Sequence, residues 1–171
     1  MYWNETNITI FNKSLALLMN FDKRASVGES TLLIKDFSIG FANDGTPKNG
    51  PTVVVGRYGN AYNFDGVNDH IDINETGLPF GNSPRVISLW FKLNILTGSQ
   101  CFIEYGTENI VESGRRIAIC HLDQATDKLV IDTLGHQFGF IWIPDTNWHQ
   151  FTVVYPGILD SSNFVLFLDG K

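Results

Sequence analysis

Hydrophobic and polar residues alternate along several short stretches of this chain, with the period of two that is typical of β-strands. The clearest stretch is residues 86–93, Val-Ile-Ser-Leu-Trp-Phe-Lys-Leu. One face of this segment carries Ile87, Leu89, Phe91 and Leu93, and the other carries Ser88, Trp90 and Lys92. The pattern predicts a strand that buries one face and leaves the other partly open to solvent.

Similar short segments, bounded by Gly, Pro, Asn or Asp, predict strands elsewhere in the chain. The predicted strands are 61–64, 70–73, 86–93, 101–105, 116–122, 128–133, 138–143, 150–155 and 164–168. Nine short strands at this spacing, with no internal repeat, indicate a two-sheet sandwich.

The remaining segments are less regular. Residues 14–21, Ser-Leu-Ala-Leu-Leu-Met-Asn-Phe, are the one stretch that a helix could claim, but they are short and lack a second apolar turn, so a buried strand is predicted. Residues 39–66 are dense in Gly, Pro and Asn-Gly pairs, which leaves room there for short strands only.

Composition and charge narrow the class of protein. A length of 171 residues corresponds to one domain, and 13 Phe against 4 Trp and 5 Tyr is a composition rich in strand formers. The formal net charge of −6 and the scattered Lys and Arg residues argue against a nucleic-acid partner. No apolar run approaches the ~18 residues that cross a bilayer, so direct membrane insertion is not expected.

Five ordered segments resemble the concanavalin A-like lectin/glucanase superfamily, specifically the laminin G-like domains of bacterial and archaeal surface proteins. They cover most of the chain and include Gly56-Arg-Tyr-Gly-Asn-Ala-Tyr-Asn-Phe-Asp-Gly-Val-Asn-Asp-His-Ile71. The other four are 17–22 (Leu-Leu-Met-Asn-Phe-Asp), 87–92 (Ile-Ser-Leu-Trp-Phe-Lys), 147–155 (Asn-Trp-His-Gln-Phe-Thr-Val-Val-Tyr) and 164–171 (Phe-Val-Leu-Phe-Leu-Asp-Gly-Lys).

The resemblance implies an all-β, two-sheet antiparallel jelly-roll β-sandwich. Residues 15–171 would form this domain, and residues 1–14 a linker or edge strand. Family domains continue past the turn at 169–171, so the sandwich is expected to lack its last strands. Either the sequence ends before the domain does, or a protein partner supplies the missing strands, because an open edge beside 164–168 favours strand pairing.

Catalysis is not expected. Related glycoside hydrolases carry a Glu-x-Asp-x-x-Glu strand motif, and the nearest match here, residues 70–75, has His70 in place of the nucleophile. Retaining hydrolysis needs two carboxylates about 5–5.5 Å apart, so this substitution removes the double-displacement route. Glu104 and Asp132 are isolated carboxylates on predicted strands. The four His and two Cys lack the spacing of a zinc site.

A sugar site needs an exposed aromatic ring with polar groups beside it. The candidates are Tyr105, Arg116, His121 and Trp142. Trp142 alternates with Phe138 and Phe140, so a place in the core is the stronger alternative for it.

Two further features concern calcium and the cysteines. Many family members hold structural calcium on loop oxygens, which makes Asp22 and Asp69 candidate ligands here, although turn capping explains both equally well. If 101–105 and 116–122 form a hairpin, Cys101 and Cys120 lie opposite one another. A cross-strand disulfide and two buried thiols are then equal alternatives.

Asn-x-Ser/Thr sequons occur at Asn4, Asn7, Asn12 and Asn74, and three of them crowd the first 14 residues. This crowding fits an exposed glycosylated stalk and an extracellular or cell-surface location. The expected function is a non-catalytic carbohydrate-binding or adhesion module whose partner is a glycan or surface polysaccharide. A structural envelope, sheath or virion component is the alternative, followed by a degenerate glycoside hydrolase.

Overall fold

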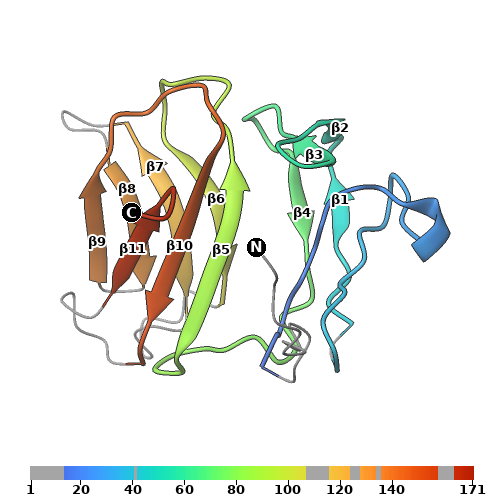
Figure 1. Ribbon diagram of the computed structural model, residues 1–171, viewed down its shortest axis with the longest axis horizontal. Helices are drawn as coiled ribbons and strands as arrows, with labels where there is room; N and C mark the ends of the chain where they lie inside the picture. Colours follow the sequence, from blue (N-terminus) through green and yellow to red (C-terminus); the bar gives the residue numbers. More distant parts are fainter. Residues whose placement is uncertain (1–13, 41, 107–115, 124–127, 134–135, 158–163) are drawn as a thin grey trace, which may run out of the picture. The chain divides into compact units, whose positions relative to one another are not determined.

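The chain is all-β, as predicted, and its sheets are antiparallel (Figure 1). The computed structural model describes residues 14–40, 42–106, 116–123, 128–133, 136–157 and 164–171. Its strands are β1 (Thr46–Lys48), β2 (Thr52–Val55), β3 (Asn60–Asn63), β4 (His70–Asp72), β5 (Arg85–Phe91), β6 (Gln100–Tyr105), β7 (Ile117–Leu122), β8 (Lys128–Thr133), β9 (His136–Ile141), β10 (His149–Tyr155) and β11 (Val165–Leu168). One turn of 3-10 helix, Ala25–Val27, precedes them.

The nine predicted strands are all present, with ends that differ by no more than two residues. β1 and β2 are the short strands for which residues 39–66 left room. The chain divides into two compact units, Met1–Leu78 and Pro79–Lys171. Among the described residues, no helix is long and apolar enough to span a membrane.

A buried polar network organises the first unit. The carboxylate of Asp36 accepts hydrogen bonds from the backbone N–H groups of Leu18 (3.0 Å), Ser38 (2.8 Å) and Asn43 (3.2 Å), and from the Ser38 hydroxyl (2.8 Å). The fully buried Asn43 amide donates to the carbonyl oxygens of Ala16 (3.3 Å) and Thr76 (2.9 Å). Three distant chain segments are therefore fixed by two side chains.

The same network explains why the predicted buried strand at 14–21 is wrong. Residues 15–21 form no strand and their side chains are half-buried. The Leu18 N–H donates to Asp36 instead of to a neighbouring strand, and Phe21 adopts a left-handed conformation with φ 59°. Contacts distant in sequence thus override the local apolar pattern.

The second unit contains two antiparallel sheets. One has the strand order β6-β7-β8-β9, and the other has the order β11-β10-β5. Figure 1 shows β5 and β10 in front of β6 and β7. Aromatic rings meet between the sheets: Phe102 of β6 lies 4.4 Å from Phe91 of β5 and 6.1 Å from Phe151 of β10 (centroid distances). The arrangement is sandwich-like.

Alternation along each strand supplies this interior. On β7 and β8, Ile117, Ile119, Leu129 and Ile131 are fully buried, and on β10 so are Phe151, Val153 and Tyr155. The predicted alternation of β5 is confirmed, because Ile87, Leu89 and Phe91 are less exposed than Val86, Ser88 and Trp90. On β5 and β10 the other set of side chains is more exposed. On β7 and β8, by contrast, Ala118, Cys120 and Val130 of the other set are buried as well.

Arg85, at the start of β5, is a buried cation that fixes the loop before the strand. Only 7% of the residue is exposed. Its guanidinium donates to the carbonyl oxygens of Pro79 (2.5 Å) and Gly81 (3.1 Å) and lies over the ring of Tyr155 at 4.8 Å. Carbonyl dipoles and an aromatic face thus replace water around this charge.

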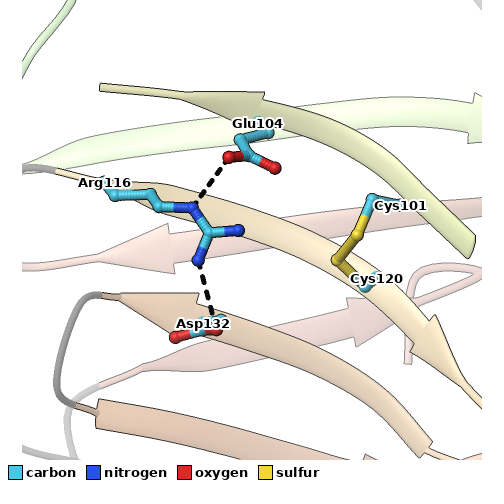
Figure 2. The surroundings of a disulfide bond; sticks show 5 residues. All are labelled: Cys101, Glu104, Arg116, Cys120 and Asp132. Carbon is cyan, nitrogen blue, oxygen red and sulfur yellow. Dashed lines mark hydrogen bonds and ion pairs between the residues drawn. A yellow bond between two sulfur atoms is a disulfide. The ribbon is translucent and has the colours of Figure 1, made fainter. Parts of the chain in front are cut away.

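On the outer face of the four-stranded sheet, a disulfide joins Cys101 to Cys120 (Figure 2). The two residues are directly paired between β6 and β7, with a Cα–Cα distance of 3.9 Å. β6 is an end strand of this sheet, and its register shifts just after Cys101. The bridge therefore holds an edge strand in place next to an irregularity.

Replacing both cysteines, as Cys101→Ser with Cys120→Ser, is expected to destabilise the protein. The two residues are separated by 19 positions, and closing a loop of this size is worth about 3 kcal/mol of unfolding free energy. Denaturant unfolding of the double variant, with Ser99→Ala as a nearby control, measures the effect. An unchanged midpoint would contradict the structural role of the bridge, and alkylation with intact-mass measurement reports whether it forms.

Candidate functional site

The structure does not gather the four predicted sugar-binding residues into one site. Tyr105 and His121 point into the interior, and His121 is 0% exposed. The Tyr105 hydroxyl donates to the Pro79 carbonyl at 3.2 Å. Trp142 is half-buried and its ring meets those of Phe91, His121 and His149 edge-on. Neither Tyr105 nor His121 offers an open ring face to a ligand.

Arg116 lies elsewhere, on the outer face of the four-stranded sheet near the disulfide (Figure 2). Its Nε donates to Glu104 at 2.8 Å and its Nη1 to Asp132 at 3.4 Å. Glu104 and Asp132 are both paired with Ala118 across β6, β7 and β8, so the guanidinium links two carboxylates along one row of the sheet. These carboxylates are held as ion pairs by one cation.

The calcium candidates Asp22 and Asp69 both have protein partners. Asp22 Oδ2 accepts from Arg24 at 2.7 Å and Oδ1 accepts from the Asn60 N–H at 3.1 Å. A Cβ on Gly59, whose φ is +68°, would come within 2.1 Å of Asp22 Oδ1, so glycine is required there. Asp69 Oδ2 accepts from the Asp65 N–H at 3.1 Å. The Asp22 oxygens thus fit a capping role better than a calcium ligand.

Of the four sequons, Asn4, Asn7 and Asn12 lie outside the described residues. Asn74 is exposed and follows β4. Its Oδ1 accepts hydrogen bonds from the N–H (3.0 Å) and the hydroxyl (2.8 Å) of Thr76. The sequon is therefore an Asx turn at the surface.

The outer face of the three-stranded sheet carries a different group of residues with binding character. The strand register aligns Trp90 with Gln150, and Ser88 with Thr152 and Phe167. A third row aligns Val86, Val154 and Val165. Trp90 is 37% exposed and Phe167 41%. We refer to these eight residues as the β5–β10–β11 outer face.

Between its two aromatic residues this face carries a short chain of hydrogen bonds. Gln150 Nε2 donates to Ser88 Oγ at 3.1 Å, and the hydroxyls of Ser88 and Thr152 are 3.0 Å apart. Ser88 Oγ also donates to the Phe151 carbonyl oxygen at 3.2 Å, so with the bonds from Gln150 and Thr152 this hydroxyl is fully used. A hydroxyl can donate once and accept twice, so it is Thr152 Oγ1 that keeps acceptor capacity for a ligand. Aromatic rings beside uncharged hydrogen-bonding groups are what sugar recognition requires.

The sequence contained a signal for this face. Trp90 stands on the polar side of the alternating segment 86–93, together with Ser88 and Lys92. An aromatic residue on the outward face of an amphipathic strand is a candidate for contact with a ligand. Its neighbours Thr152 and Phe167, however, come from strands more than sixty residues away, and only the strand pairing reveals them.

His149, at the start of β10, lies on the inward side of the sheet, with its ring beside those of Phe91 and Trp142. Its Nδ1 lies 2.8 Å from Asp169 Oδ2, and its Nε2 lies 3.0 Å from Asp145 Oδ1. The Asp169 N–H in turn donates to the Gln150 carbonyl oxygen at 2.8 Å, and the Gln150 N–H donates to Asp169 Oδ1 at 2.9 Å. The loop at 145, the start of β10 and the turn after β11 are thereby joined at Gln150.

The hydrogen-bond partners of His149 and Asp145 shift the pKa values of both side chains. Burial lowers the pKa of His149, but the hydrogen bonds to Asp169 and Asp145 outweigh it and raise the pKa above its ordinary value. Hydrogen bonds from the Asn147 backbone and from His149 lower the pKa of Asp145 to about 2. A protonated imidazole donates through both nitrogens, whereas a neutral one can donate through only one.

Comparison with protein-family models, with curated proteins and with solved structures finds no match for this chain. The superfamily suggested by the sequence therefore remains a prediction.

The His149 contribution to stability is expected to depend on pH. Because its pKa is raised in the folded state, the stabilisation is fully present below the unfolded value, about 6.5, and is lost as pH rises through the folded value. Denaturant unfolding of the wild type and of His149→Gln across this range measures it. The stability difference should shrink towards alkaline pH. A constant difference would contradict the role of Asp145 and Asp169 in holding the protonated His149.

Calcium is expected to leave the Tm unchanged, because Arg24 and Asn60 already occupy the Asp22 carboxylate. Thermal unfolding in EDTA and in excess calcium chloride tests this. A higher Tm in calcium that is lost in Asp22→Asn, but kept in Asp65→Asn, would show instead that Asp22 is a ligand.

Proposed function

We propose that this chain is a non-catalytic carbohydrate-binding or adhesion module of a cell-surface or secreted protein, built on a concanavalin A-like jelly-roll sandwich. The observation that carries the proposal is the β5–β10–β11 outer face. There, Trp90 and Phe167 lie next to a hydrogen-bonded group of three polar side chains, Gln150, Ser88 and Thr152. The site is therefore proposed on this sheet, and not at the four residues that the sequence nominated.

Binding is favoured over catalysis by the state of the strand carboxylates. Glu104 and Asp132 both pair with Arg116, which is unlike the free acid and nucleophile that glycoside hydrolysis requires. At the nearest match to the hydrolase motif, His70 Nε2 lies 3.3 Å from Asp72 Oδ1. A degenerate glycoside hydrolase is therefore the weakest of the three alternatives.

An extracellular or cell-surface location is supported by the disulfide, because such bridges form and persist in oxidising compartments. The exposed Asx turn at Asn74 presents a glycosylation sequon to solvent, which agrees with that location.

A structural surface or assembly protein is the second candidate. The valine row of the same face favours it, since Val86 is 64% exposed and Val165 46%, and exposed apolar rows mark protein contacts. Among the described strands, β11 pairs with β10 alone, so a partner could add a strand beside it.

Screening the full chain on a glycan array tests the proposal. We expect binding above background and a loss of about tenfold or more in affinity for Trp90→Ala, because a stacked ring supplies both apolar area and orientation. Phe64→Ala is the control, since Phe64 is an exposed aromatic residue of the other unit.

An array without signal, together with a stable oligomer that Val165→Asp dissociates, would replace the carbohydrate proposal with the assembly role. Cleavage of a polysaccharide would replace it with the enzyme.

A further inference from the structure

We propose that the ligand of the β5–β10–β11 outer face is an uncharged oligosaccharide chain that crosses all three strands, with one sugar ring stacked on Trp90 and another on Phe167. This inference rests on the proposed carbohydrate-binding function and adds the ligand class and the two subsites.

The separation of the two aromatic residues sets the length of the ligand. Trp90 is on β5 and Phe167 on β11, with β10 between them. Their partners on β10, Gln150 and Thr152, are two residues apart. Two strand spacings of about 4.8 Å and two residue rises of about 3.4 Å place the two backbone positions roughly 12 Å apart on the diagonal. A single pyranose ring cannot cover both side chains, so the ligand is a chain.

The groups between the aromatic residues fit the hydroxyls of such a chain. Gln150 and Thr152 of β10 lie between Trp90 and Phe167 in the strand register, and Ser88 lies beside Trp90 on β5, in line with Thr152. Their mutual hydrogen bonds of 3.0 and 3.1 Å fix the side chains before a ligand arrives. Preordered polar groups reduce the entropy that binding costs.

The charge of the face sets the class of sugar. The eight outward side chains within β5, β10 and β11 are uncharged. Lys92, which follows β5 on the same side as Trp90 and is exposed, places one cation at the end of the face. At the end of the face, Asp169 is engaged by His149 and by the Gln150 N–H. The chain carries a net charge of −6, which disfavours polyanions such as uronates or sulfated glycans. Neutral glycans are the matching class.

The alternative occupant of this face is a protein surface seated on Val86, Val154 and Val165. The two occupants depend on different residues: the sugar chain needs the rings of Trp90 and Phe167, whereas a protein contact needs the valine row. Substitutions of the two aromatic residues and substitutions in the valine row therefore distinguish a sugar ligand from a protein partner.

The experiment measures binding of the full chain to immobilised neutral oligosaccharides of increasing length, and to uronate, sialylated and sulfated series of matched length. The variants are Trp90→Leu and Phe167→Leu, which keep an apolar side chain but remove the ring. Phe167→Tyr restores a ring, and Phe64→Leu is the control outside the face. Thermal unfolding confirms that each variant is folded.

The expected result is neutral-glycan binding that rises with length beyond a disaccharide. Each Leu variant should weaken it by about tenfold, the size of one lost ring contact, while Phe167→Tyr and Phe64→Leu should not. Three results would overturn this inference and leave the carbohydrate-binding function standing. They are monosaccharides that bind as tightly as longer chains, a higher affinity for charged than for neutral glycans, and a loss of affinity in Trp90→Leu without any loss in Phe167→Leu. Binding to no glycan of any series would overturn both.

Discussion

The shared interior of the two sheets in Pro79–Lys171 is the constraint on which the rest of that unit depends. Alternate side chains of β5, β7, β8 and β10 fill it, and several of them, such as Ile119 and Phe151, are fully buried. Burial of one such side chain contributes roughly 1.5–3 kcal/mol, so a strand that turned its other face inward would lose several of these contributions at once. The outward set, with Trp90 among it, is fixed as the complement of the inward set.

Hydrogen bonds from polar side chains hold the irregular segments that do not contribute to this apolar interior. In the first unit, Asp36 accepts four hydrogen bonds and Asn43 spans two carbonyls, so segments that form no regular ladder are still held. In the second unit, Arg85 holds the loop before β5. Each of these hydrogen bonds favours one arrangement, because breaking it would leave a further buried donor or acceptor unpaired, which is costly.

The strands were predictable from the sequence, and the candidate site was not. The period of two in 86–93 and its neighbours marks strands because it depends on nearby residues alone. The prediction for 14–21 failed where Asp36, distant in sequence, takes the Leu18 N–H. Tyr105 and His121 were chosen for their chemistry, but the packing of the two sheets buries them. Trp90, Thr152 and Phe167 come to share one face only through strand pairing, which no local pattern encodes.

The bridge between Cys101 and Cys120 has a mechanical consequence. If the chain is pulled from points beyond both cysteines, the tension passes through the sulfur atoms and not through the segment between them, because the two residues are bonded across a separation of 19 positions. That segment would add roughly 65 Å of extended chain if it were released. The β6–β7 hairpin is thus shielded from pulling force, and the domain would lengthen less before it fails.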